Sequence, residues 1–490
     1  MPESRIPPDA KTAPVTRAVS PEADVDVPTS PQSTGETEPG PVPAAPGLWS
    51  GLRPLLLRLH FYAGILIGPF ILVAAVTGLA YTVTPQVESM LYDHELKVTP
   101  RGTAEPLADQ VAAAKRAVPD GTLLSVTKGA GPTDSTRVTF SRDDLPEGYT
   151  LTAFVDPYDS KVLGELKTFG QWLPARAWLD DLHRNLHLGD FGRNYSEIAA
   201  SWLWVEVLGG LALWAGTPRN RQRLRRLLLP RGGTKSRRRT LSWHGAVGLW
   251  ASVGLLALSA TGLTWSAHAG ASIGKIQDAL GGTTPAVSTA LSATGGSGGG
   301  AGSAKKDVGI DAVIASAHDA GLVGVLVVTP PGDADSAYVV KENTRSWPEQ
   351  QDSVAVDPAT GKVTQKLNFD DFPLLAKMTS WGIDAHMGLL FGLANQIVLA
   401  LLAIAVIAMT LWGYRMWWLR RPTRAEGLAV GRAPARGAWR RVPGRVLAPV
   451  VVPAAVIGYY VPFFGLPLLL FVLVDVAVGA VRRRRAGAIA

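Results

Sequence analysis

Histidines open two apolar segments of this chain in the same way. His60 and His244 each lie at the start of such a segment, with a glycine four residues later and a Thr-Gly-Leu triplet seventeen residues later, at Thr77 and Thr261. Ionisable side chains are costly inside a bilayer, so a histidine at the same register of two apolar segments is expected to have a function. The spacing predicts a duplicated chain in which each half carries a functional histidine.

A second histidine motif precedes the later apolar segment of each half. His187 and His386 correspond to one another, because each is followed by glycine at the second next position and then by Phe-Gly. His183 has no counterpart in this alignment, since Gly382 or Ile383 falls at its position. We therefore expect one histidine from each half at this second level.

Apolar segments long enough to cross a bilayer recur along the sequence. The chain has 490 residues, of which 47% are hydrophobic. A hydrocarbon core of about 30 Å requires about 20 apolar residues in a helix. This rule predicts four transmembrane helices, at residues 59–83, 196–215, 244–268 and 388–412. A fifth apolar stretch, 446–481, is interrupted by Pro462, Gly465 and Pro467 and has basic flanks, which predicts a hairpin with both ends on one side.

Basic residues gather between these helices. Residues 218–240 contain ten Lys or Arg and no acidic residue, and 415–445 is a second basic segment, whereas 85–180 and 269–379 mix both signs. The positive-inside rule then places the basic loops and both termini in the cytoplasm, and the mixed segments outside. The placement of the basic residues thus orients a multi-pass protein of the cytoplasmic membrane, with the lipid bilayer as its partner. The net charge of +8 does not indicate nucleic-acid binding. The first 46 residues are polar and lack an apolar core, so we expect a disordered cytoplasmic tail and no cleavable signal peptide.

The two outer segments repeat a small α+β pattern. The first reads as a helix at 104–118 with strands at 123–127, 137–141 and 149–156, and the second as a helix at 307–320 with strands at 323–329, 337–342 and 351–357. Each ends in a turn that begins with Asp-Pro, at Asp156 and Asp357. The stretch 281–303, rich in Gly, Ser, Thr and Ala, is expected to be a flexible linker. We therefore expect one α+β module in each half.

These patterns define the expected domain organisation. It consists of a disordered tail (1–49), transmembrane helix 1 (50–84), outer module 1 (85–180), transmembrane helix 2 (181–217), a basic loop (218–240), transmembrane helix 3 (241–268), a linker with outer module 2 (269–380), transmembrane helix 4 (381–418), a second basic loop (419–445), a hairpin (446–481) and a cytoplasmic tail (482–490). The fold class is an integral membrane, mainly α-helical protein. Its duplicated unit is two transmembrane helices flanking an extracytoplasmic α+β module, and a C-terminal hydrophobic hairpin follows.

The topology places the histidines in two pairs, one for each leaflet. His60 and His244 lie at the cytoplasmic face, and His187 and His386 at the outer face. A histidine from each of two facing helices, with a nearby glycine that lets a flat group approach, suits bis-imidazole haem ligation in a bundle. The chain has no cysteine, which excludes thiolate ligation, cysteine-bound iron–sulfur clusters and Cys-x-x-Cys-His attachment. We therefore predict two b haems, one for each pair.

Other interpretations of these histidines remain open. His183 or His268 could replace either ligand of the outer haem. An interfacial histidine can also serve only as a hydrogen-bond partner between helices. His183 and His187 are four residues apart and could form a two-histidine metal site, but no Glu follows His183, so the zinc-protease motif His-Glu-x-x-His is absent.

Taken together, these motifs resemble the PepSY-associated transmembrane family, which includes iron-regulated PiuB-type membrane proteins. The resemblance rests on the paired histidine starts with Thr-Gly-Leu, the His-x-Gly openings and the Asp-Pro-x-Thr-Gly-Lys-Val turn at Asp357, and it covers about residues 53–421. The first module departs from that turn at Tyr158-Asp159-Ser160. The resemblance implies PepSY-like outer modules and a haem-containing inner-membrane reductase that releases iron from ferric siderophores. It also implies that His60, His187, His244 and His386 are the candidate haem ligands.

The expected function is transmembrane electron transfer to ferric iron or a ferric siderophore at the outer face, in iron acquisition. No Gly-x-Gly-x-x-Gly fingerprint follows a strand, so the donor should be a membrane quinol or a separate reductase. A rival interpretation is a non-enzymatic membrane protein whose PepSY-like modules bind a partner or regulate a peptidase. A transporter is disfavoured, because apart from the histidines and Glu206 the spans lack the carboxylates of proton-coupled carriers.

Overall fold

The computed structural model describes residues 48–216, 230, 236–291, 307–420 and 442–487. Within these residues, four helices are long and apolar enough to cross a membrane, and a bent pair forms a fifth span if it is counted as one. The four are α7 (Gly189–Ala215), α10 (Ser236–Thr264), α14 (Gly392–Trp418) and α16 (Pro462–Gly487), and the bent pair is α1 (Leu48–Leu66) with α2 (Gly68–Tyr81). The protein is therefore a multi-pass membrane protein. The predicted N-terminal tail and basic loops lie largely outside the described residues.

The first span is bent by 58° between α1 and α2. Pro69 lies at the start of α2 and has no N–H, so it cannot bond to the carbonyl of Ile65 four residues earlier. The Tyr414 hydroxyl of α14 donates to that carbonyl at 2.8 Å. At the bend, a Cβ on Gly68 would lie 2.9 Å from the same hydroxyl oxygen. The bend thus has an identifiable cause, and α14 satisfies the carbonyl that it frees.

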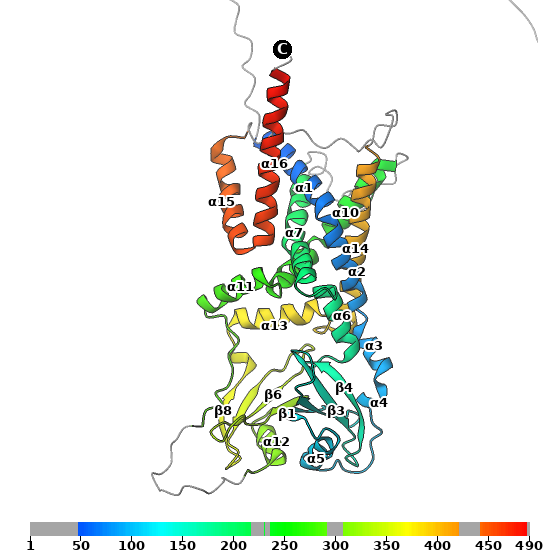
Figure 1. Cartoon of the computed structure of the whole chain (residues 1–490), viewed down its shortest axis with the longest axis vertical. Coiled ribbons are helices and arrows are strands. Elements are labelled where there is room, and N and C mark those ends of the chain that lie inside the picture. The colour runs from blue at the N-terminus through cyan, green and yellow to red at the C-terminus, as the bar shows by residue number, and fades with distance from the viewer. Residues whose placement is uncertain (1–47, 217–229, 231–235, 292–306, 421–441, 488–490) are drawn as a thin grey trace, which may run out of the picture. The chain divides into compact units, whose positions relative to one another are not determined.

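A C-terminal helical hairpin packs against the spans. Its helices α15 (Gly444–Tyr460) and α16 lie side by side (Figure 1) and contact each other closely. Arg58 of α1 forms an ion pair with Asp475 of α16, and the indole N–H of Trp202 in α7 donates to the carbonyl of Phe463 at 2.9 Å. Both contacts join the hairpin to the first two spans, where an unpaired charge would be costly.

The strands of both outer segments form one continuous antiparallel sheet of order β4-β3-β2-β1-β5-β6-β7-β8. The expectation of one module in each half therefore needs correction, because β1 pairs with β5 and joins the halves, with Val126 opposite Val328. The strands are β1 (Thr122–Lys128), β2 (Thr136–Ser141), β3 (Tyr149–Val155), β4 (Val162–Phe169), β5 (Leu326–Thr329), β6 (Tyr338–Glu342), β7 (Ser353–Val356) and β8 (Val363–Leu367).

The two edge strands, β4 and β8, had not been predicted. Most residues of both are exposed or half-buried, so neither carries the apolar alternation that reveals a half-buried strand. Lys167 and Lys366 lie on these edges, and such charges discourage edge-to-edge association.

One face of the sheet is covered by α5 (Leu107–Ala117) and α12 (Ile310–Asp319), one helix from each half (Figure 1). Their apolar faces form a single core with the strands, in which Ala114, Val126 and Val328 are completely buried. Asp311 of α12 accepts the N–H groups of Leu107 and of the next residue, at 2.6 and 3.1 Å, at the N-terminus of α5. A carboxylate stabilises a helix N-terminus in this position, so the halves share both a core and a helix cap.

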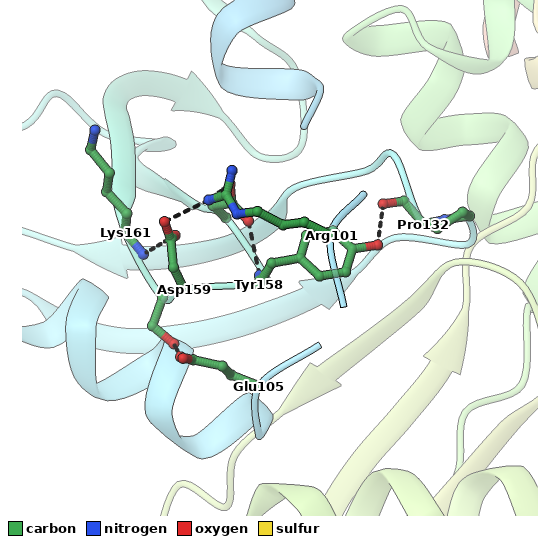
Figure 2. A network of polar contacts seen from close by, with 8 residues as sticks. Arg101, Glu105, Pro132, Tyr158, Asp159 and Lys161 are labelled. Atoms are coloured by element: carbon green, nitrogen blue, oxygen red, sulfur yellow. Dashed lines mark hydrogen bonds and ion pairs between the residues drawn. The ribbon is translucent and has the colours of Figure 1, made fainter. Parts of the chain in front are cut away.

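The turn that departs from the family pattern is held by its own contacts (Figure 2). Arg101 donates to Asp156 at 2.8 Å and to Asp159 at 2.5 Å, and the Tyr158 hydroxyl donates to the carbonyl of Pro132 at 2.7 Å. These contacts fix the backbone of the first module where the second has Thr-Gly. The departure therefore has a local structural role.

Five shorter helices connect the sheet to the spans. They are α3 (Thr84–Leu91), α4 (Asp93–Leu96), α6 (Pro174–Asn185), α11 (His268–Ala279) and α13 (Leu374–His386), and a 3-10 turn at Phe369–Asp371 precedes the last. The segment 181–217, expected as one helix, is divided between α6 and α7 by a turn. The third span ends at Thr264, and His268 begins α11. In Figure 1, α6 and α13 lie between the bundle and the sheet.

Replacing Tyr414 by Phe should destabilise the bend. The carbonyl of Ile65 would lose its hydrogen-bond donor, while the volume of the side chain would change little. A buried carbonyl without a partner lowers the free energy of unfolding by about 1–3 kcal/mol. We expect a lower midpoint of thermal unfolding in detergent, followed by circular dichroism. Tyr459→Phe is the matched control, because that ring is 81% exposed. Equal midpoints for both variants would contradict this account of the bend.

Candidate functional site

A cavity of about 200 Å³ lies between the spans and is lined by both His183 and His386. Its wall is mainly apolar and comes from four helices, α2, α7, α10 and α14. Representative wall residues are Ile71, Ala74, Leu203, Leu258, Leu399 and Leu402. The histidines enter from α6 and α13, one from each half of the chain. Two imidazole rings therefore meet in a largely apolar space.

A threonine fixes the orientation of the His183 ring. The hydroxyl oxygen of Thr77 lies 2.9 Å from Nδ1 of His183, and the same hydroxyl donates to the carbonyl of Val73 at 2.9 Å. Since the single hydroxyl proton serves this carbonyl, the oxygen accepts from Nδ1–H. The Nε2 lone pair is then available as a ligand, which is how an outer hydrogen bond selects a histidine tautomer.

His386 has the same arrangement in the second half. The hydroxyl oxygen of Thr261 lies 2.6 Å from Nδ1 of His386 and donates to the carbonyl of Ala257 at 2.8 Å. Thr77 and Thr261 are the threonines of the repeated Thr-Gly-Leu triplet. The structure therefore gives this part of the repeat a role, because each threonine orients one cavity histidine.

The glycine after Thr77 permits this close contact. A Cβ on Gly78 would lie 3.1 Å from Cε1 of His183, which is tighter than ordinary van der Waals contact, whereas a Cβ on Gly262 would lie at an ordinary 3.8 Å from Cε1 of His386. Gly78 thus lets the His183 imidazole approach the helix backbone closely.

His187 and His268, two of the sequence candidates, do not line the cavity. His187 has a left-handed backbone with φ of 54°, and its ring contacts Asp181 at 2.5 Å and stacks on Trp178. The backbone N–H of His268 caps α11 by donating to Glu197 at 3.1 Å. The structure brings His386 together with His183 and separates His187 from both. His183 and His187 consequently do not form the two-histidine site considered above.

A sequence signal for His183 exists and was missed. The pattern Trp-x-x-Asp-x-His occurs at Trp178-x-x-Asp181-x-His183 and again at Trp381-x-x-Asp384-x-His386. Alignment on the shared His-x-Gly selects His187 instead, because the first half has four more residues between the cavity histidine and that glycine. Alignment on the helix that carries the histidine gives the pair that the structure shows.

His60 and His244 form a second pair, on α1 and α10. Their ring centroids are 6.3 Å apart with an interplanar angle of 71°. Nδ1 of His60 lies 2.7 Å from a carboxylate oxygen of Glu206, and Nδ1 of His244 lies 3.1 Å from the carbonyl oxygen of Met409. The contact of His60 is within ion-pair distance but lacks hydrogen-bond geometry. The Met409 carbonyl can only accept, so it favours Nδ1–H on His244 and leaves Nε2 of that ring free.

The two pairs lie at opposite ends of the membrane helices. His244 and Thr261 are seventeen residues apart on the unbroken helix α10, which is about 26 Å at 1.5 Å for each residue. Among the described residues, no group of three or more His, Asp or Glu side chains is placed to hold a metal ion. Each pair instead offers two imidazoles, with glycines beside them, as bis-imidazole haem ligation requires.

A charged layer borders the cavity on the sheet side. Arg176 pairs with Glu88 at 2.7 Å, and Arg345 pairs with Asp384 at 2.6 Å. Both guanidinium groups lie over the ring of Trp172, at 4.9 and 5.0 Å from its centroid. Burial raises the pKa of the Asp384 carboxyl to about 7, although the Arg345 guanidinium opposes this shift. Burial likewise raises the pKa of Glu88 against the effect of Arg176. This layer connects the α6 and α13 halves through one indole ring.

Replacing Thr77 by Val should release the tautomer of His183. Nδ1–H of His183 would lose its acceptor, while the side-chain volume at residue 77 would stay nearly the same. The loss of one hydrogen bond costs about 1 kcal/mol of stability. Nitrogen NMR of the labelled histidine rings in detergent should show a mixture of tautomers in Thr77→Val and the Nδ1–H form in the wild type and in Thr77→Ser. An unchanged His183 signal in Thr77→Val would show that the threonine does not orient the ring.

Comparison with known proteins supports the architecture. The family model described as the PepSY-associated TM region matches residues 57–420, which include all four histidines of the two pairs. No curated protein matches the chain. Because the match covers well over half of the 490 residues, the chain belongs to the PepSY-associated transmembrane family.

Proposed function

We propose that this protein is a haem-containing transmembrane electron-transfer protein that reduces ferric iron or ferric siderophores at the outer face of the cytoplasmic membrane. The observation that carries the proposal is the apolar cavity in which His183 and His386 each have Nδ1 satisfied and Nε2 free. Such preorganised nitrogens are suited to an axial ligand role.

The residues fit haem b at two positions. His183 and His386 would be the ligands in the cavity next to the sheet, and His60 and His244 the ligands at the other end. This assignment replaces His187 by His183 and gives no ligand role to His268. When bound, haem supplies an iron centre that gains and loses one electron at a time. With one site at each end of the spans, electrons can cross the membrane in short steps.

The protein's own contribution is orientation and control of charge. Thr77 and Thr261 hold the imidazoles of the outer pair, and Glu206 lies against the ring of His60. Hydrogen bonding and charge at the outer nitrogen raise ligand basicity and tune the metal. The apolar wall excludes water from the cavity, which keeps the dielectric low and sets the redox potential.

The direction of transfer follows from the expected topology. The basic loops favour a cytoplasmic position for the end that carries His60 and His244. A quinol or a separate reductase would supply electrons, and the outer modules would lie near the ferric substrate. Iron bound by a ferric chelate is substrate in this proposal.

Haem content of the purified protein is the direct test of the ligands. We expect b-type spectra before and after dithionite and about two haems in each chain by pyridine haemochrome, since each pair offers two axial ligands. Replacing His183, His386, His60 or His244 by Ala should lower the content to about one. His187→Ala and His268→Ala are the controls and should retain both. A wild-type protein without haem, made with ample haem supply, would refute the proposal and favour partner binding by the outer modules.

Activity is tested separately in sealed vesicles. Protein reconstituted with a reducing quinol pool should reduce a membrane-impermeant ferric chelate on the module side, measured by a ferrous-specific chromophore. His183→Ala should slow this reduction at least tenfold, because electron transfer falls steeply when an axial ligand is lost, while His187→Ala should not. If haem-loaded protein reduced no ferric chelate, the proposed ferric substrate would be excluded. The proposal of electron transfer through haem would still stand.

A further inference from the structure

Arg193 is a cation in the wall of the outer cavity. It lies near the start of α7, is half-buried and lines the same space as His183 and His386. Its guanidinium donates to the carbonyl of Trp265 at 3.4 Å, which is longer than an ordinary hydrogen bond. An ionisable side chain at such a place is expected to have a specific partner.

The acidic groups around this cavity have other partners. Asp180 accepts from Arg184 at 3.1 Å. Glu197, one turn beyond Arg193, accepts the N–H groups of His268 and Ala269 at 3.1 and 2.8 Å through its two oxygens. In the described parts of the chain, no carboxylate lies within ion-pair distance of Arg193.

The position of this cation is unusual in one further way. The corresponding position of the second half, counted from the shared Phe-Gly, is Leu393, which is 64% exposed. Only the first half therefore places a cation here, so the repeat does not account for it.

We propose that Arg193, with Arg184 in the same cavity wall, binds an anionic group of the molecule that occupies the outer cavity. The inference rests on the proposed function for the identity of that molecule. Guanidinium groups bind carboxylates strongly, because their planar donors match the two oxygens. The anion has two possible sources with this chemistry. One is a propionate of the haem held by His183 and His386, and the other is a carboxylate of an anionic ferric chelate that enters from the outer side.

The first measurement compares Arg193→Gln and Arg193→Lys with wild-type protein loaded with haem. A bound carboxylate that loses its cation leaves more negative charge near the iron. We therefore expect a several-fold loss of haem affinity at the outer site in Arg193→Gln, a midpoint potential shifted to more negative values, and partial recovery of both in Arg193→Lys. The control is Arg142→Gln, which removes one positive charge from a partly exposed arginine that pairs with Asp144.

Two arms separate the sources of the anion. With haem dimethyl ester, whose propionates are uncharged, wild type and Arg193→Gln should bind equally if the propionate is the partner. If the ferric chelate is the partner, haem content and potential stay unchanged in Arg193→Gln, and the KM for a carboxylate-rich ferric chelate rises several-fold while the KM for a neutral chelate does not.

The inference and the proposed function fail in different ways. Absence of haem from the wild type removes the proposed function. Haem-loaded wild type and Arg193→Gln with the same haem affinity, potential and KM for both chelates would overturn the role of Arg193 and leave electron transfer in place. A loss of folding in Arg193→Gln would appear as loss of both haems, and Arg193→Lys then provides the comparison.

Discussion

The candidate site depends on the single hydroxyl proton of each of two threonines, because a proton donated to one acceptor cannot be donated to another. Thr77 and Thr261 both donate their hydroxyl proton to their own helix, so the oxygen can only accept from the imidazole. This constraint decides which nitrogen of His183 and His386 is free. It also ties α6 to α2 and α13 to α10. A rotated ring would leave a buried N–H without a partner, so the geometry of the cavity and the chemistry of its ligands have the same cause.

The edge strands of the sheet lead into α6 and α13, the two helices that carry the cavity histidines. These strands are β4 and β8, and each leads within a few residues into a histidine-bearing helix, α6 after Phe169 and α13 after Leu367. The distance between the edges is fixed by the ladder of eight strands, whose centre is the β1–β5 pair. Trp172 adds a second link, since the arginines over its ring belong to the two halves. The module thus sets the spacing of the histidines whether or not it also contacts a substrate.

The sequence was sufficient for the family and the membrane class, because long apolar segments and a repeated motif are local signals. The same motif singles out His386, which the structure places in the cavity wall. The sequence was insufficient for the partner of His386. The left-handed turn at Leu186 and His187 lengthens the first half by four residues before the glycine of His-x-Gly, and an alignment made from one side of that turn assigns the wrong histidine. The joined sheet was missed for a different reason: periodicity identifies strands but not their neighbours. The edge strands β4 and β8 lack even that periodicity, since water contacts most of their residues. Haem binding and ferric reduction stay predictions.

The β1–β5 pair at the centre of the sheet brings matching residues of the two halves opposite one another. Val126 and Val328, each followed by threonine in its strand, lie directly opposite one another. Equivalent residues that face each other across an antiparallel pair form an isologous contact, of the kind found at the axis of a symmetric dimer. A chain with only one half would expose the β1 edge, and two such chains could close the same eight-stranded sheet. At this strand pair the two halves of the sheet are therefore related as the subunits of a symmetric dimer are, although they differ elsewhere, as at Arg193 and Leu393.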